Sequence, residues 1–171
     1  MNDLMPFLER RTTGKDGQAR LACSKCDLIV YENPKIVVGS VIADKEAVLL
    51  CQRRIQPSAE LWTVPAGYLE LGETLEEGAR REAWEEAQVE IETDGVLALY
   101  SSTKKAEVEI FFRARPTSPH HAPGAETLAT RLFAWDEIPW SFLAFPSVGA
   151  LLKVWHQRRH QPLPSSFAVG D

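Results

Sequence analysis

The most informative part of the chain is residues 67–89, which read GYLELGETLEEGARREAWEEAQV. Thr74 is followed three residues later by Glu77, the spacing of a capping box, in which each residue satisfies a backbone N–H at the start of a helix. This pattern predicts a helix over residues 74–88 that begins at Leu75. The expected helix also carries a stripe of small apolar residues suited to close packing on a sheet, namely Leu75, Ala79, Ala83 and Ala87.

Three carboxylates of this helix fall on one face. At 100° per residue, Glu82, Glu85 and Glu86 lie within an arc of about 100°, and Gly78 shares that arc, where it is expected to leave room above them. Like charges spaced three and four residues apart repel each other, and a helix built for solubility would alternate its signs. The pattern therefore predicts a positive group among the carboxylates, and oxygen ligands of this kind suit Mg²⁺ or Mn²⁺.

The charge of the chain is concentrated in the same region. The 171 residues carry a net charge of −5, yet residues 70–92 hold nine Glu against two Arg, so the rest of the chain is slightly basic overall. A hydrophobic content of 44% and a charged content of 25% are ordinary for globular proteins and exclude disordered and fibrous classes. Because no basic patch is apparent, a general nucleic-acid surface is not expected.

The sequence gives no sign of a membrane or secretory protein. No apolar run approaches the roughly 20 residues of a membrane span, and the first residues lack the basic-then-apolar layout of a signal peptide. The three cysteines do not form a secreted disulfide framework. We therefore expect a cytoplasmic protein that does not interact with membranes.

The remaining periodicity predicts strands surrounding two helices. Strands are expected over residues 36–42, 47–52, 61–64, 96–101, 108–114 and 131–135, and a second helix over 147–160. This mixed order indicates an α/β or α+β layered domain. We expect three parts: an N-terminal segment over 1–34, a main domain over 35–160, and a loose tail over 161–171.

The spacing within residues 67–89 resembles the Nudix box, Gly-x5-Glu-x7-Arg-Glu-U-x-Glu-Glu-x-Gly-U, in which U is apolar. All of its specified positions match except that of Gln88, where the family has Gly. Glycine at that position supports a left-handed turn after the helix, so Gln88 is expected either to add strain or to lengthen the helix. The resemblance implies an α/β/α sandwich with a mixed sheet and a catalytic loop-helix-loop.

The resemblance also implies Mg²⁺-dependent hydrolysis of a nucleoside diphosphate linked to a further group. Carried over by position, Gly67 belongs to the box loop, and Glu73 and Arg81 form an ion pair that orients the loop and the helix. The implied metal ligands are Glu82, Glu85, Glu86 and the backbone around Ala66. Divalent ions suit this chemistry because they neutralise phosphate charge and acidify an attacking water.

Outside the box, the likeness extends over roughly residues 35–155 and is closer to a subgroup that begins with a zinc ribbon. That subgroup includes the chloroplast FAD pyrophosphatase of plants, and the stretches similar to it include Tyr31-Glu-Asn-Pro-Lys35 and Leu143-Ala-Phe145. FAD, cleaved to FMN and AMP, is therefore the leading substrate, with ADP-ribose or a nucleotide sugar as the alternative. NADH is disfavoured because the Ser-Gln-Pro-Trp-Pro-Phe-Pro array of NADH pyrophosphatases is absent. A silent, nucleotide-sensing domain is also disfavoured, since all three box carboxylates are present.

The N-terminal segment carries half of a zinc ribbon. A closed structural zinc site needs four ligands, commonly two CxxC pairs, but only Cys23 and Cys26 form such a pair here. Asp3-Leu-Met-Pro-Phe-Leu8 stands where the other pair is expected, and Cys51 lies in an apolar run typical of the core. We interpret the segment as a degenerate ribbon without metal. Zinc shared across a dimer or with a histidine remains the alternative.

The residues that complete the site are less clearly marked. Arg53 or Arg54 could reach phosphates, although adjacent strand residues face opposite sides. Trp62, Tyr68 and Tyr100 are the candidates for stacking on a ring. For the proton acceptor we favour Glu126, which together with Glu85 and Arg81 forms the expected catalytic group; its rivals are Glu107, Glu109 and Glu137. By family analogy, the protein is expected to be a homodimer that acts on a small dinucleotide.

Overall fold

The computed structural model describes residues 7–13, 16–26 and 28–163. The chain divides into two compact units, Met1–Pro34 and Lys35–Asp171. In the described residues, no helix combines the length and the apolar character needed to cross a membrane.

The smaller unit is a three-stranded antiparallel sheet in the order β1-β2-β3. Its strands are β1 (Leu8–Thr12), β2 (Ala19–Cys23) and β3 (Ile29–Val30). The sequence shows little periodicity here because most of these side chains are exposed or only partly buried. Ala22 and Cys23 are the buried apolar residues described in this unit.

The larger unit contains a seven-stranded mixed sheet. Its main path runs β10-β5-β4-β9-β8, with the short strands β6 and β7 paired to β5 and β4. β4 and β9 are parallel, whereas their other pairings are antiparallel. The strands are β4 (Lys35–Asp44), β5 (Ala47–Arg53), β6 (Trp62–Thr63), β7 (Ala66–Tyr68), β8 (Ile91–Ser102), β9 (Glu107–Pro116) and β10 (Thr127–Phe133).

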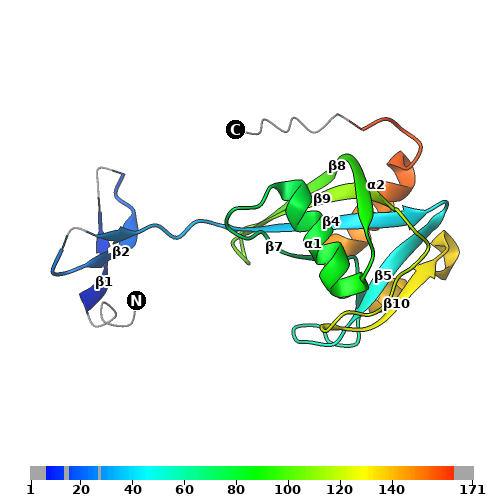
Figure 1. Cartoon of the computed structure of the whole chain (residues 1–171). Helices are drawn as coiled ribbons and strands as arrows, with labels where there is room; N and C mark the ends of the chain where they lie inside the picture. The colour runs from blue at the N-terminus through cyan, green and yellow to red at the C-terminus, as the bar shows by residue number, and fades with distance from the viewer. Residues whose placement is uncertain (1–6, 14–15, 27, 164–171) are drawn as a thin grey trace. The chain divides into compact units, whose positions relative to one another are not determined.

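Two helices cover opposite faces of this sheet (Figure 1). Alternation along β4 explains the layering: Val41 belongs to a core cluster with Leu151 and Trp155 of α2 (Pro146–Arg158), whereas its neighbour Ile42 packs with α1 (Leu75–Ala87). Short 3₁₀ helices at Trp135–Glu137 and Trp140–Phe142 lead into α2. The predicted mixed α+β layered fold is confirmed.

The predicted start of α1 is also confirmed. The Glu77 backbone N–H donates to Thr74 Oγ1 at 3.2 Å, and the Thr74 N–H donates to the Glu77 carboxylate at 2.7 Å. The stripe of Ala79, Ala83 and Ala87 is fully buried on the sheet. Local sequence therefore sets both where the helix begins and which face it buries.

The role expected for Gly78 was wrong. A Cβ added there would lie 2.8 Å from Val38 of β4 and 2.9 Å from both Glu73 and Leu69. The missing side chain thus lets α1 approach the sheet and the loop before it, rather than leaving space above the carboxylates.

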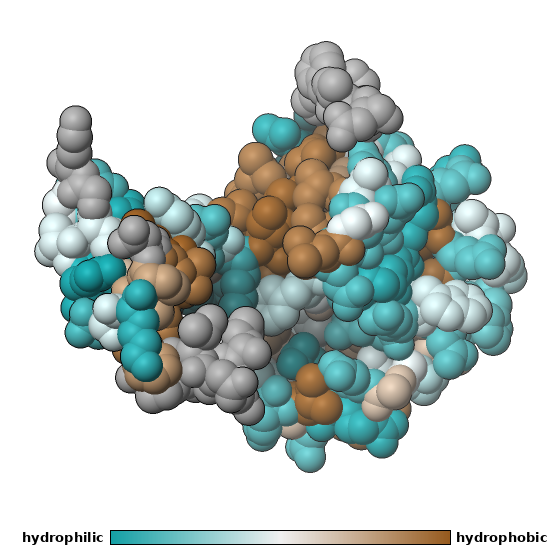
Figure 2. Space-filling model, turned by 60° about the vertical axis from the view of Figure 1, so that its left-hand side comes forward, coloured by the Kyte–Doolittle hydropathy of each residue, from teal (hydrophilic) through white to brown (hydrophobic). Residues whose placement is uncertain are grey.

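The outer surface of the larger unit is uneven in polarity. Figure 2 shows a continuous hydrophobic area on one part of this unit, next to a mainly hydrophilic surface. Among the large apolar side chains exposed on this unit are Leu71, Leu99 and Phe142.

Candidate active site

A cavity of about 990 Å³ opens in the larger unit. Its walls come from β4, β5 and the loop after it, β7, α1, the start of β9, the loop before β10, and the start of α2. This volume lies at the upper end of the usual range for small-molecule sites. The three carboxylates predicted from the sequence, Glu82, Glu85 and Glu86, all line it.

Two of these carboxylates are buried. Glu82 is 7% exposed and Glu86 is 9% exposed, whereas Glu85 lies on the open side of the helix. The backbone N–H of Ala66 donates to Glu86 Oε2 at 3.1 Å, which ties the helix to β7. A Cβ added at Gly67 would lie 2.3 Å from Glu82 Oε1, so only glycine there leaves space for this carboxylate.

Burial makes these acids hard to ionise. Burial, reinforced by the negative charges of Glu82 and Glu126, raises the pKa of Glu86 to about 7, although the Ala66 N–H and the charge of Arg53 act in the opposite direction. Burial likewise raises the pKa of Glu82 above its ordinary value, while Arg81 opposes the shift. The site therefore holds two acids whose ionised forms are poorly solvated, so a cation that supplied compensating charge would favour their ionisation.

Arg81 connects the box residues. Its guanidinium donates to both oxygens of Glu73, at 2.7 and 3.0 Å, in the planar two-point geometry that suits arginine. The same group donates to the Tyr68 carbonyl at 3.0 Å, to Glu82 at 2.6 Å and to Glu85 at 3.2 Å. Arg81 therefore links the loop before α1 to two of the helix carboxylates.

The donor set fits a divalent cation. In the described ranges, no three His, Cys, Asp or Glu side chains converge in a ready-made metal site, and Arg81 is the cation that contacts Glu82 and Glu85. Nevertheless, carboxylate oxygens on one pocket wall, two of them buried and with raised pKa values, are the hard ligands that Mg²⁺ or Mn²⁺ prefers.

Of the residues predicted to bind substrate, the structure brings two to the cavity. Arg53 and Tyr68 line it, whereas Arg54 does not and instead donates to the Thr127 carbonyl at 2.9 Å. Trp62, predicted as a stacking residue, lies outside the lining and packs edge-on against Phe133 in the core, with ring centroids 4.9 Å apart. The half-buried Trp62 ring is thus used in packing on Phe133 and its neighbours, which accounts for its position outside the lining.

The candidates for the proton acceptor are also separated by their positions. Glu126, Glu107 and Glu109 line the cavity. Glu126 is exposed to it, Glu109 is 5% exposed, and Glu107 accepts a hydrogen bond from the Tyr68 hydroxyl at 2.8 Å. Glu137 lies outside the lining and caps a 3₁₀ helix by accepting from the Ala134 N–H at 3.3 Å.

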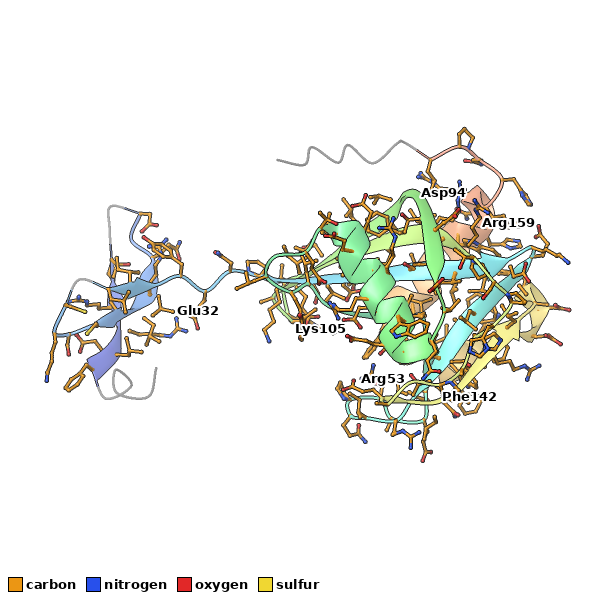
Figure 3. The ribbon with its side chains drawn as sticks, viewed as in Figure 1. Glu32, Arg53, Asp94, Lys105, Phe142 and Arg159 are labelled. Carbon is orange, nitrogen blue, oxygen red and sulfur yellow. The ribbon has the colours of Figure 1, made fainter. Side chains whose placement is uncertain are left out.

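Several other cavity residues belong to no motif of the sequence, among them three that come from a turn and from the start of a helix. Lys105 comes from the turn between β8 and β9, and Phe145 and Ser147 come from the start of α2. Their only sequence signal was Phe145 within the stretch Leu143-Ala-Phe145, because cavity positions drawn from distant loops share no periodicity. Figure 3 labels Arg53 and Lys105, which reach this region from different elements.

The cysteines occupy different environments. Cys51 is buried in β5, as predicted, and burial raises the pKa of its thiol well above the ordinary value. Cys23 is buried and Cys26 is exposed, and the Lys25 N–H approaches the Cys23 sulfur at 3.4 Å. This N–H and the neighbouring Cys26 lower the pKa of the Cys23 thiol.

Comparison with protein families gives a match to the NUDIX domain over residues 33–152, which covers most of the chain. A solved structure, a NUDIX hydrolase from Nitrosomonas europaea, superposes with a TM-score of 0.87 at 39% identity and covers 92% of this chain and 90% of that one.

Curated relatives match over shorter stretches. A MutT-like protein of Streptomyces ambofaciens is 32% identical over 60% of this chain and 66% of its own length. An ADP-ribose pyrophosphatase of Methanocaldococcus jannaschii is 33% identical over 43% of this chain and 43% of its own length. The chain thus spans less than two thirds of each of these two relatives.

Proposed function

The chain belongs to the Nudix family, and from this premise we propose that it is a Mg²⁺- or Mn²⁺-dependent pyrophosphohydrolase. Its substrate would be a nucleoside diphosphate linked to a further group, cleaved at the diphosphate bond. The observation that carries the proposal is the set of helix carboxylates on one wall of the cavity, with Glu86 buried and held by the Ala66 N–H at 3.1 Å.

The metal would be held by Glu82, Glu85 and Glu86, assisted by the backbone around Ala66. A divalent ion bound there would supply a charge that neutralises the diphosphate and lowers the pKa of the attacking water. For Glu82 and Glu85 to serve as ligands, they must give up their contacts with Arg81, whose pairing with Glu73 persists as an anchor of the loop.

The other roles follow from position. Arg53 lines the cavity and its charge acts on Glu86, so it is placed to attract the phosphates. Glu126 is exposed in the same cavity and its charge also acts on Glu86, so it is placed to take a proton from water near the metal. Arg81 acts as a positioning residue, because its hydrogen bonds fix the box loop.

FAD is the leading substrate. The sequence stretches similar to FAD pyrophosphatases support it, and a cavity of about 990 Å³ has the capacity for a dinucleotide. ADP-ribose is the second candidate, favoured by the relative of that name in Methanocaldococcus jannaschii.

The test is a substrate panel. FAD, ADP-ribose, NADH and ADP-glucose are incubated with the protein with and without Mg²⁺, and AMP release is measured. We expect Mg²⁺-dependent release of AMP that is fastest from FAD.

The metal assignment has its own test. Glu86→Gln should lower the rate at least about 100-fold while leaving the fold intact, since glutamine keeps the shape of the side chain but removes the charge of a ligand. Near wild-type turnover of this variant at saturating Mg²⁺ would refute the metal assignment.

Family analogy further supports a homodimer. Light scattering coupled to size-exclusion chromatography measures the mass directly, and a mass of 19.1 kDa would contradict it.

A further inference from the structure

The turn that carries Glu126 is closed by its own backbone. The Thr127 N–H donates to the Gly124 carbonyl at 3.2 Å, so that Ala125 and Glu126 form the centre of a tight turn. Both central residues are exposed and line the cavity, whereas Thr127 is 1% exposed. The turn therefore presents its tip to the cavity, and the elements that hold its base decide where the Glu126 carboxylate lies.

One side of this base is docked on the last turn of α1. The Gly124 N–H donates to the Glu86 carbonyl at 3.1 Å. Just before it, the Ala122 N–H donates to the Ala87 carbonyl at 2.9 Å. The last carbonyls of a helix lack partners within the helix, so this segment satisfies two of them. Figure 1 shows the segment, in yellow, beside the end of α1. The turn and the carboxylate helix are thus joined through the backbone of Glu86.

The approach of the turn to α1 depends on glycine. A Cβ added at Gly124 would lie 1.7 Å from the Glu85 carbonyl oxygen and 3.3 Å from the Glu86 Cα. Both are backbone atoms of a packed helix, which cannot move aside as the end of a flexible side chain could. Any larger residue at this position would therefore displace the turn from the helix.

The other side of the base is held by Arg54, directly after β5. Its backbone N–H donates to the Glu126 carbonyl at 2.8 Å, and its guanidinium donates to the Thr127 carbonyl at 2.9 Å. Immediately beyond, the pairing of β10 with β5 shifts register between Thr127 and Ala129. Such a shift bends a strand and changes the direction of its side chains. Arg54 therefore fixes the chain at the start of this irregularity, although it lies outside the cavity lining.

We infer that Arg54 is a positioning residue for Glu126, and that Gly124 sets how closely the turn approaches α1. Arg54 acts from β5 and Gly124 from the helix side, so together they fix the Glu126 carboxylate relative to the helix carboxylates. The inference rests on the proposed function, in which Glu126 takes a proton from water near the metal. A displacement of about 1 Å in a group of this kind can cost about 100-fold in rate.

The first test separates kcat from KM. Arg54→Ala removes the hydrogen bond to the Thr127 carbonyl but keeps the backbone N–H, so the turn keeps part of its support. With the fastest substrate of the panel at saturating Mg²⁺, we expect kcat to fall about tenfold with little change in KM. Arg54→Lys keeps a charged donor and should recover most of the rate. Arg131→Ala is the matched control, because Arg131 lies on β10 with its side chain 59% exposed and outside the cavity lining, so kcat should be unchanged.

A double-mutant cycle tests whether Arg54 acts through Glu126. Two changes that disable the same group are not additive, so Arg54→Ala should have no further effect on kcat in the Glu126→Gln background. Gly124→Ala should lower kcat at least about 100-fold and show the same non-additivity. Should Gly124→Ala fail to fold, the Arg54 cycle alone decides. A tenfold loss in both backgrounds, an unchanged kcat in Arg54→Ala, no recovery in Arg54→Lys, or full activity of Glu126→Gln would overturn the inference.

A measurement without turnover separates this inference from the proposed function. In Arg54→Ala, the Gly124 and Thr127 amides should exchange hydrogen about fivefold faster than in the wild type, whereas the Ala83 amide in the middle of α1 should be unaffected. Unchanged exchange at the turn would overturn the inference while leaving the hydrolase intact. Absence of hydrolysis of every nucleotide by the wild type would refute the proposed function, whereas the exchange rates would still show whether Arg54 holds the turn.

Discussion

Glu86 shows how one residue couples the fold to the site. Glu86 lies on the buried face of α1, in the last turn of the helix, and its carboxylate accepts a hydrogen bond from the Ala66 N–H. Its pKa is raised to about 7, principally by burial. An ordinary glutamate ionises near pH 4.3, so the native protein keeps a proton at neutral pH that the unfolded chain has already released. The metal-free site therefore opposes folding, and a bound cation would remove that opposition.

The consequence is a pH-dependent effect of Glu86→Gln on stability. Because the native state binds the extra proton, the wild-type free energy of unfolding falls as pH rises from about 4.5 to about 7 and then levels off. Glutamine carries no charge, so in EDTA the variant should be more stable at pH 8, by at most about 3 kcal/mol, and the difference should fall to about 1 kcal/mol at pH 5. Urea unfolding at both pH values measures it.

Two outcomes check this reasoning. Adding Mg²⁺ at pH 8 should raise the melting temperature of the wild type and have little effect on Glu86→Gln, since a ligand stabilises only the state that binds it. A variant that is less stable than the wild type at pH 8 without metal would show that the hydrogen bond to Ala66 outweighs the cost of the buried charge.

A second prediction at this scale concerns the proton acceptor. Glu126→Gln should lower kcat by about 10²- to 10⁴-fold with little change in KM and no change in thermal stability, because the side chain is exposed in the cavity. Glu109→Gln serves as the comparison, since Glu109 also lines the cavity but lies within 3.9 Å of Lys105. If Glu109→Gln gives the kinetic pattern and Glu126→Gln stays active, the role belongs to β9.

At the scale of the element, the end of α1 explains the one departure from the Nudix box. The helix ends at Ala87, and Gln88 adopts the left-handed conformation with φ 47° and ψ 39°. Of the two expected outcomes, the structure shows strain and not a longer helix. Gln88 N–H still reaches the Trp84 carbonyl at 2.9 Å, so the turn keeps its hydrogen bond despite the Cβ that disfavours this conformation.

Gln88→Gly should therefore stabilise the protein. Glycine removes the steric cost of the left-handed conformation, about 1–2 kcal/mol, and part of this gain is offset by the greater freedom of glycine in the unfolded chain. We expect a net gain of about 0.5–1 kcal/mol and an increase of roughly 1–4 °C in melting temperature. Because the side chain of Gln88 is exposed, little packing is lost.

The matched control is Gln88→Ala, which keeps the Cβ and should give no gain. Calorimetry on the two variants separates the backbone effect from a side-chain effect. An equal gain in both, or a loss in Gln88→Gly, would contradict the strain account.

Elements defined by local signals could be predicted, and those shaped by distant contacts could not. The capping box at Thr74 placed α1, and the apolar runs within residues 36–42 and 47–52 placed β4 and β5, which pair as a hairpin. β8 begins at Ile91 rather than at residue 96, because a register shift around Gly95 interrupts its alternation. β10 begins earlier than expected, at Thr127, and the chain after Phe133 turns into a 3₁₀ helix.

The site divides in the same way. The carboxylates and Arg81 lie on one helix, so spacing alone grouped them. Trp62 lies in β6 and Phe145 directly precedes α2, and a bridge between Trp62 and Leu143 brings the two segments together. Phe145 lines the cavity, whereas Trp62 packs on Phe133. No periodicity in the sequence contains that information.

At the scale of the whole molecule, the two units differ in how they are stabilised. The larger unit has two core clusters, one on each face of its sheet. In the smaller unit, the buried apolar side chains described are Ala22 and Cys23. Domains of fewer than about 40 residues usually need metals, disulfides or partners to be stable. The three-stranded sheet should therefore open more readily than β4 and β9.

The zinc content of the protein follows from the same small unit. Cys23 and Cys26 supply two thiolates, which is half of a tetrahedral zinc shell. In the stretch where the second ligand pair would be expected stands an aromatic residue, Phe7. The Ser24 N–H donates to the Phe7 carbonyl, and the centroid of the Phe7 ring lies 3.6 Å from Lys25 Nζ. The more N-terminal residues of that stretch, including Asp3, lie outside the described residues.

Elemental analysis after desalting should find well under one zinc per chain, and hydrogen exchange of the β1–β3 amides should be fast and unchanged by EDTA. Cys51→Ser is a control that leaves the pair intact. One tightly held zinc per chain, with exchange accelerated by EDTA and by Cys26→Ser, would show that two further ligands complete the site.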